Sequence, residues 1–492
     1  MRKIPYTIDE IKNVYEKLVR YAEQTNEQGN YKRTALVIQR CACMEYLIND
    51  RYSDYRLNNL LKQISNKIVS PPNYDYTTNP KRILFYGGDV IDNQGLTMQY
   101  LDAIISLGKY EVLFLNESSF NSTNQKIYNY LKTKGIETVE ICDQRWEDKI
   151  CHIAQVVYDF APGMILFHLW PWSTLPFISL YSHPSIKFQI NLTDHAYWLG
   201  GSDFFNYSFE FRNYGRTVSV EKRGFNDRQL LRLPFYPWIE KTDFKGFPEE
   251  LKGKKILFTG GALYKISGEN NLFLNIVKNI LSNNNNVVFV FAGGGNPSQL
   301  WEFVKNDPIM SGRTYYLGFR DDIEEVMKRS DVYLDTYPFG GGLMVQIAAT
   351  NSKPILVYKD TDVENLVGTK KKSKFVFNKI EDLIREANHL FCDETYYRER
   401  SLFFKSLISD RIDFVNSFKG CLDNHKTFAE PLDSIDYIGF TNQYLERMNS
   451  GYNRTDFESL AFRTCPTSLS LKMYFNLIMG LKYEIGKILR KK

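Results

Sequence analysis

The sequence has few of the features that mark secreted, zinc-stabilised or membrane-spanning proteins. Its seven cysteines are odd in number and show no Cys-x-x-Cys spacing, so neither a disulfide framework nor a zinc site is indicated. No run of 18 apolar residues occurs, and the N-terminal segment MRKIPYTIDEIKNVYEKL is charged and lacks the apolar stretch of a signal peptide. A reducing compartment fits these absences, and we expect a cytoplasmic protein.

An excess of one charge is also missing. The 62 Lys and Arg residues against 57 Asp and Glu residues leave a net charge of +5, so nucleic acid is not expected as a partner. The composition, with 43% hydrophobic residues, is that of a folded globular protein. The aromatic share of 15% suits a groove that stacks ring-shaped ligands, and it equally suits a coding bias.

The order of apolar runs predicts two α/β domains, because 492 residues exceed what one core usually supports. A strand, loop, helix and strand follow one another from RILFYGG (82–88), and the same alternation starts again at KKILFTGG (254–261). We expect parallel sheets in both, with residues 244–254 as the linker. The expected parts are a helical N-terminal region (1–79), a first Rossmann-like domain (80–240), a second Rossmann-like domain (241–420) and C-terminal helices (421–492).

A Gly-rich turn in the second domain is typical of an anion site. A buried type of strand ends at Asp335, the glycines 340–342 follow, and a helix is expected to begin near Leu343. Glycines allow close backbone approach, and the free N–H groups at a helix start favour a diphosphate. A plain strand-to-helix turn without a ligand is the alternative.

A second turn of this kind lies in FTGGALYKISGEN (258–270). Its strand ends in Gly260 and Gly261, and Lys265 stands just before an expected helix. A lysine there can neutralise phosphate charge with three hydrogen-bond donors, although a solvated surface lysine is the simpler interpretation. Two such turns in one domain are more informative than either alone.

The strings LYKI (263–266), SDVYLDTYPFGGG (330–342) and KPIL (353–356) resemble the catalytic half of the O-GlcNAc transferase family and of the related bacterial N-glucosyltransferases that modify adhesins. The resemblance implies the two-domain glycosyltransferase B (GT-B) fold, a UDP-sugar donor, no metal, and inversion at the anomeric carbon. It also implies that the donor is bound by Lys265, Gly318, Phe319, Arg320, Gly341, Gly342, Leu343 and Met344. From the residues themselves we add Gly260 and Gly261 of the turn before Lys265, and Gln346, which reaches a ribose hydroxyl if the helix starts in a slightly different register.

This chain departs from the family's pattern at the start of the phosphate-binding helix. The relatives have hydroxyl side chains where this chain has Leu343 and Met344, so only backbone donors remain. They have a ribose-binding Asp where this chain has Ile347, with Gln346 one residue earlier.

The candidate acceptor side lies in the first domain. Asp194 and His195 follow a predicted strand, and a histidine of near-neutral pKa can act as general base toward an acceptor hydroxyl beside a carboxylate. A structural histidine is the alternative, and we name the two as a catalytic pair. Gly87, Gly88 and Gly95 flank the loop after the first strand, which we expect between acceptor and donor. The segment 215–224 is interpreted as a solvated basic loop.

Two further segments carry weaker signals. The triplet DTD at 360–362 imitates a metal-binding pattern but is short and frequent, so no metal and no other cofactor is expected. The segment from 468 to 492 is a basic amphipathic helix. It is expected to pack back on the protein, and the alternative is peripheral contact with the inner face of the cell membrane.

The sequence as a whole predicts a nucleotide-sugar-dependent glycosyltransferase. Its acceptor is expected to be a glycan or a lipid-linked saccharide in bacterial surface-polysaccharide biosynthesis. A protein O- or N-glycosyltransferase is the first alternative, and a catalytically inactive GT-B partner subunit is the second.

Overall fold

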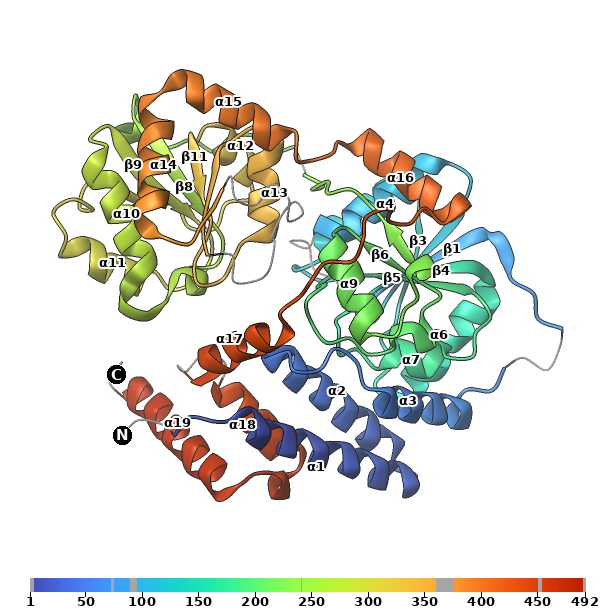
Figure 1. Cartoon of the computed structure of the whole chain (residues 1–492). Helices are drawn as coiled ribbons and strands as arrows, with labels where there is room; N and C mark the ends of the chain where they lie inside the picture. The colour runs from blue at the N-terminus through green and yellow to red at the C-terminus, as the bar shows by residue number, and fades with distance from the viewer. Residues whose placement is uncertain are drawn as a thin grey trace. The chain divides into compact units, whose positions relative to one another are not determined.

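The computed structural model describes residues 4–71, 75–88, 95–239, 241–359, 375–449 and 454–489. Its contacts divide the chain into two units (Figure 1). The first unit joins Met1–Arg232 to Cys421–Lys492, and the second is Leu233–Gly420. Both ends of the chain therefore belong to the first unit. The segment 244–254, which the sequence suggests as a linker, lies within the second.

The first unit contains a seven-stranded sheet with the order β3-β2-β1-β4-β5-β6-β7, in which every pair is parallel. Leu84 of β1 pairs with Leu113 and Ile165, and all three are buried. The strands are β1 (Asn79–Gly87), β2 (Glu111–Asn116), β3 (Glu137–Glu140), β4 (Pro162–His168), β5 (Ile186–Ile190), β6 (Tyr207–Glu210) and β7 (Leu230–Arg232). The helices between them are α4 (Gly95–Leu107), α5 (Gln125–Thr133), α6 (Trp146–Phe160), α7 (Leu175–Leu180), α8 (Gly201–Phe204) and α9 (Asn213–Lys222).

Helices from both ends of the chain complete the first unit. Figure 1 shows the blue N-terminal helices beside the red C-terminal ones, and α2 contacts both α17 and α18. The Asn476 side chain pairs with both backbone groups of Ile4 at 3.0 and 2.9 Å, and Lys472 forms a 2.8 Å ion pair with Glu10. The helices are α1 (Ile8–Glu27), α2 (Tyr31–Ile48), α3 (Tyr55–Ile68), α17 (Tyr437–Asn449), α18 (Arg454–Thr464) and α19 (Leu471–Leu489). The C-terminal helix thus packs back on the protein, as expected.

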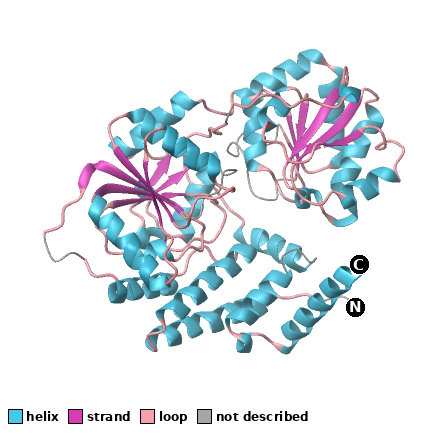
Figure 2. Cartoon of the chain, turned by 180° about the vertical axis from the view of Figure 1, so that it is seen from behind, coloured by secondary structure: helices cyan, strands magenta, loops and turns pink. Residues whose placement is uncertain are grey.

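The second unit contains a six-stranded parallel sheet with the order β10-β9-β8-β11-β12-β13. Figure 2 shows the strands of each sheet in magenta with cyan helices around them. The strands are β8 (Lys255–Gly260), β9 (Val287–Ala292), β10 (Thr314–Tyr316), β11 (Val332–Leu334), β12 (Ile355–Tyr358) and β13 (Val376–Phe377). The helices are α10 (Leu272–Asn283), α11 (Ser298–Lys305), α12 (Ile323–Lys328), α13 (Gly342–Thr350), α14 (Ile380–Cys392), α15 (Glu394–Lys405) and α16 (Arg411–Asn424), which runs across the unit boundary.

Both sheets have the doubly wound strand order of Rossmann-like domains. The chain adds strands outward from β1 and from β8, and then returns to the other side of that strand through β4 and β11. The prediction of two parallel α/β sheets is confirmed. Across the described ranges, no helix combines the length and apolar character needed to span a membrane.

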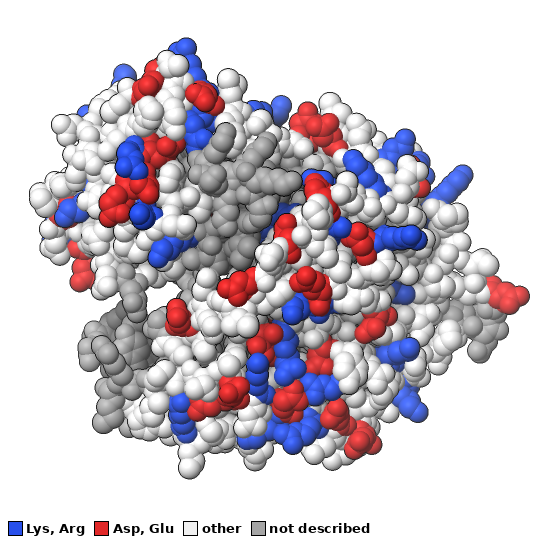
Figure 3. All heavy atoms as spheres, in the orientation of Figure 1, with Lys and Arg blue, Asp and Glu red and all other residues white. Residues whose placement is uncertain are grey.

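Charge on the surface is mixed in sign. On the face drawn in Figure 3, the Lys and Arg side chains (blue) and the Asp and Glu side chains (red) are interspersed among the other described residues (white). Over the described residues of this face (Figure 3), Lys and Arg form no broad stripe.

Candidate functional site

The two predicted phosphate turns meet in the second unit. Its strand order reverses between β8 and β11, which is the point where ligands bind in such sheets. Lys265 follows β8 in the short 3-10 helix Leu263–Ile266, and its Nζ donates to the Gly340 carbonyl oxygen at 3.0 Å. A lysine and a Gly-rich helix start, 75 residues apart in sequence, are thereby side by side.

Glycines hold the turn after β8 against a third segment. Gly261 N donates to Ala292 O at 3.0 Å, and Leu263 N donates to Gly294 O at 2.8 Å. A Cβ atom on Gly293 would lie only 1.6 Å from the Gly261 oxygen. Sequence reasoning missed this segment as part of the site, although the run AGGG at the end of a predicted strand was a usable signal.

The Asp335 side chain holds the Gly-rich turn (340–342) in place. It is buried, and its Oδ1 accepts from Gly341 N at 2.9 Å and from the Tyr333 hydroxyl at 3.3 Å. Burial raises the pKa of this carboxyl to about 7, although the bond from Gly341 acts in the opposite direction. Its Oδ2 has no partner within the described part of the chain. In the sequence Asp335 is recognisable only as a strand end, whereas in the structure it supports the turn.

The helix α13 begins at Gly342, and its first N–H groups have no acceptor within the helix. Leu343 is 42% exposed, whereas Met344 packs so closely on Gly260 that a Cβ there would lie 2.5 Å from the Met344 methyl carbon. Gln346 is half-buried, and Ile347 is buried. The helix start therefore offers backbone donors among apolar side chains.

The loop 318–320 is tied to the same turns. The Gly318 carbonyl accepts from Gly293 N at 2.8 Å, and Phe319 is 74% exposed. Arg320 donates twice to the buried Asp322, at 2.6 Å each, and once to Gly246 O at 3.0 Å. The guanidinium therefore stabilises the loop, and Phe319 is an exposed side chain on it.

The Asp194 and His195 pair follows β5 in the first unit. The Asp194 carboxylate accepts from Arg212 at 2.6 and 2.5 Å, and His195 Nδ1 lies 3.7 Å from Asp194 Oδ1. Burial alone would raise the pKa of Asp194, but the charge of Arg212 and the contact with His195 hold it well below its usual range. A carboxylate bound in this way is a weak base. Asp194 can orient His195, which is the better candidate for proton removal.

The loop that carries this pair is held by a buried arginine. Arg223 Nη2 donates to Asp194 O at 2.9 Å and to Ala196 O at 2.5 Å. Arg216 is buried as well and pairs with Asp227 at 2.5 Å. The segment 215–224 was predicted to be a solvated loop. That prediction is wrong, because the segment lies mostly in α9 and its two arginines point inward to satisfy carbonyl and carboxylate groups.

The glycines of the acceptor-side loop lie at β1 and α4. A Cβ atom on Gly87 would lie 2.8 Å from the Phe114 ring, and one on Gly88 would lie 2.9 Å from Leu169. Gly95 begins α4. The residues between them (89–94) lie outside the described residues, as does the DTD triplet at 360–362. In the ranges that are described, no three His, Cys, Asp or Glu side chains gather as a metal site.

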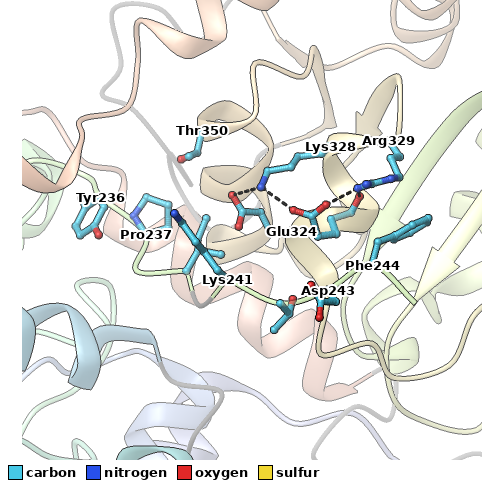
Figure 4. Close-up of a pocket in the computed structure, with 12 residues that line it drawn as sticks. Tyr236, Pro237, Lys241, Asp243, Phe244, Glu324, Lys328, Arg329 and Thr350 are labelled. Carbon is cyan, nitrogen blue, oxygen red and sulfur yellow. Dashed lines mark hydrogen bonds and ion pairs between the residues drawn. The ribbon is translucent and has the colours of Figure 1, made fainter. Parts of the chain in front are cut away.

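A pocket of about 520 Å³ lies elsewhere in the second unit, between the segment 236–244 and α12 (Figure 4). Its charged groups neutralise one another. Lys328 pairs with Glu324 at 3.3 Å and with Glu325 at 2.8 Å, and Arg329 lies 4.1 Å from the Phe244 ring centre. None of the predicted donor residues lines it, so it gives no support to the donor site.

No family model and no curated protein matches the chain. Solved structures do resemble it. A glycosyltransferase from Rickettsia africae aligns with 76% of this chain and 100% of its own, at 11% identity and a TM-score of 0.50. A candidate UDP-N-acetylglucosamine 2-epimerase from Listeria monocytogenes aligns with 72% of this chain and 100% of its own, at 12% identity and a TM-score of 0.50. An O-GlcNAc transferase variant from Thermobaculum terrenum covers 88% of this chain and 85% of its own, at 12% identity and a TM-score of 0.48.

Identities this low establish the fold and no more. The fold that the resemblance implied is confirmed: this chain has the two-domain GT-B fold.

Proposed function

We propose that this chain is a glycosyltransferase that moves a sugar from a nucleotide-sugar donor, a UDP-sugar by the family resemblance, to a hydroxyl of a glycan or lipid-linked saccharide. We propose bacterial surface-polysaccharide biosynthesis as its setting. The observation that carries the proposal is the contact of Lys265 with the turn before α13, at the switch point of the second sheet. A solved glycosyltransferase of similar fold supports it.

The donor diphosphate would bind to the second unit. Lys265 Nζ can exchange its hydrogen bond to the Gly340 carbonyl for one to a phosphate oxygen. The first N–H groups of α13 add partial positive charge. As the bond from the anomeric carbon to the diphosphate breaks, negative charge grows on the leaving phosphate. A fixed cation and fixed N–H dipoles stabilise that charge more than the ground state. These residues supply the stabilisation without a metal.

The acceptor would be activated by the first unit. His195 takes the proton of the acceptor hydroxyl as the oxygen attacks the anomeric carbon, and the ionised Asp194 stabilises the resulting imidazolium. The resemblance to O-GlcNAc transferases implies that this attack inverts the anomeric configuration. A protein hydroxyl or amide remains the alternative acceptor.

A second candidate function is that of a catalytically inactive partner subunit. The apolar Leu343 and Met344 at the start of α13 favour it, because relatives have hydroxyl groups there. The retained Lys265 and the glycines 340–342 count against it.

The test is nucleotide binding followed by turnover. Melting curves are recorded with UDP, GDP, dTDP and ADP in EDTA, and a ligand at 100 times its Kd should add about 2.7 kcal/mol of stability. The protein is then incubated with UDP-glucose, UDP-galactose or UDP-N-acetylglucosamine, and release of UDP is followed. Transfer or slow hydrolysis of one donor supports the proposal. Conversion to an isomeric UDP-sugar without UDP release would identify an epimerase instead, and binding without turnover would identify the inactive subunit.

We further propose that α19 attaches the protein peripherally to the inner face of the cell membrane. Leu471, Phe475 and Ile478 recur on one exposed side of this helix, with Leu471 89% exposed. Five of the last twelve residues are Lys or Arg, which suits anionic lipid. Leu471→Ser should reduce sedimentation with phosphatidylglycerol vesicles. The control Leu402→Ser, at a site 72% exposed on α15, should not. If both variants sediment with the vesicles to the same extent as the wild type, the proposed attachment is wrong.

A further inference from the structure

We propose that Trp170 and Trp172, beside His168 at the end of β4, form an aromatic platform that binds a sugar ring of the acceptor. The proposal rests on the glycosyltransferase function above and gives its acceptor a chemical class, a carbohydrate rather than a peptide. All the residues that carry it lie in the first unit.

The platform stands at the switch point of the first sheet. The strand order reverses between β1 and β4, just as it reverses between β8 and β11 in the second sheet. Crevices at the carboxyl ends of such strand pairs are where ligands of doubly wound sheets bind. His168 is the last residue of β4, and its carbonyl accepts from Gly88 N, just past β1, at 3.0 Å. Trp170 follows two residues later.

The two indoles form a flat and anchored surface. Their ring centres are 5.4 Å apart with planes inclined by 10°, and the Tyr46 ring of α2 meets Trp172 edge-on at 5.0 Å. Trp172 packs against the hydrophobic core, Trp170 stacks on Trp172, and both indoles are partly exposed. Backbone bonds from Ser173 N to Trp170 O and from Leu199 N to Pro171 O, both 3.0 Å, fix the turn.

The chemistry of this surface matches a sugar ring. One face of a pyranose is made of C–H groups that pack on an aromatic plane, while its hydroxyls point outward and need hydrogen-bond partners. Among the described residues, neither indole N–H of Trp170 or Trp172 has an acceptor, so both can donate to hydroxyls. A peptide backbone presents no such continuous face of C–H groups, so the exposed part of the indole surface favours a sugar ring.

His168 adds a buried polar group without a partner. It is 2% exposed, and its Nδ1 lies 2.8 Å from the Thr97 hydroxyl. Its Nε2 has no partner within the described ranges. Burial lowers the pKa of His168 to about 4, so the ring is neutral at physiological pH. His168 therefore places an unpartnered neutral nitrogen at the end of β4, two residues before Trp170.

The experiment is saturation-transfer NMR on the full chain, with maltotriose, cellotriose and chitotriose as probes. We expect at least one of them to receive saturation from the aromatic protons of the wild type. Trp170→Ala should weaken its binding at least 10-fold, and Trp170→Phe, which keeps a ring, should retain part of it. The matched control is Trp301→Ala, because Trp301 is 41% exposed on α11 of the second unit. This control should bind like the wild type.

Two outcomes would overturn the platform: no transfer to any of the three sugars, or equal binding by Trp170→Ala and Trp301→Ala. The UDP melting shift is measured on the same samples. A wild type that responds to UDP but to no sugar refutes only the platform. A wild type that binds sugar but no nucleotide refutes the proposed transferase while leaving a carbohydrate site.

Discussion

Replacing Gly293 by alanine should break the donor site, although Gly293 is not expected to touch the donor. The new Cβ would lie 1.6 Å from the Gly261 carbonyl oxygen, and real Cβ atoms essentially never come closer than 3.0 Å to another atom. The Gly261 oxygen must therefore move by more than about 1 Å, and this backbone cannot swing away as a side chain could. The movement breaks the bonds from Gly261 N to Ala292 O and from Leu263 N to Gly294 O. Lys265 lies two residues after Leu263, so the movement of this turn displaces it as well.

Overpacking of this kind costs about 1–3 kcal/mol, which lowers the Tm of a domain of this size by about 2–12 °C. The matched control is Gly294→Ala, because a Cβ there meets nothing within 4 Å. Differential scanning calorimetry and UDP titration are run on both variants. Gly293→Ala should melt earlier and bind UDP at least 10-fold more weakly, whereas Gly294→Ala should match the wild type. If the two variants behave alike, the close contact between the two Gly-rich turns is wrong.

The remaining predictions concern the acceptor base and the buried carboxyl. His195→Ala should lower transfer by roughly 100-fold or more without weakening UDP binding, and a lowered Tm with near-normal transfer would make it a structural histidine. Asp194→Asn should lower transfer less than His195→Ala, since a carboxylate bound by Arg212 orients the base and does not replace it. In the folded protein Asp335 keeps its proton up to about pH 7, against an ordinary pKa of 3.8, so its contribution to stability is present below pH 3.8 and is lost as the pH rises to about 7. The free energy of unfolding of the wild type relative to Asp335→Asn should therefore fall by about 2–3 kcal/mol between pH 5 and pH 7 in urea titrations. A flat difference would show that Asp335 is ionised in the fold.

Most of the fold could be predicted because it depends on local pattern. The central strands of both sheets are short apolar runs buried on both faces, such as Ile83–Tyr86, and the helices between them carry ordinary 3.6-residue periodicity. The edge strand β3 (Glu137–Glu140) is polar and half-exposed, so it has no such signal. The boundary between the two units was harder to predict. Phe244 and Phe247 pack against the core of the second unit, and a breaker-rich segment does not reveal such packing in its composition.

The site could be predicted in part, where it is made of backbone. Gly260, Gly261 and Lys265 were proposed from their place at the end of a predicted strand, and the structure brings Lys265 to the Gly340 carbonyl. The contact between Gly293 and Gly261 could not be predicted, because these residues are distant in the sequence and meet only in the folded chain. Arg223 is buried and donates to the Asp194 carbonyl rather than to solvent, and a single sequence carries no sign of that burial.

The central claim is that Lys265 and the start of α13 bind a nucleoside diphosphate without a metal. The most direct measurement is isothermal titration of UDP in EDTA into the wild type, Lys265→Ala and Lys255→Ala. Lys255 is the matched control: it is also half-buried and also donates to a carbonyl, that of Phe391 at 2.8 Å, but it stands at the opposite end of β8. We expect saturable binding by the wild type and by Lys255→Ala. For Lys265→Ala we expect a loss of about 1.5–3 kcal/mol, at least 10-fold in Kd. Absence of binding in EDTA that returns with Mg²⁺, or equal affinities of the two lysine variants, would contradict it.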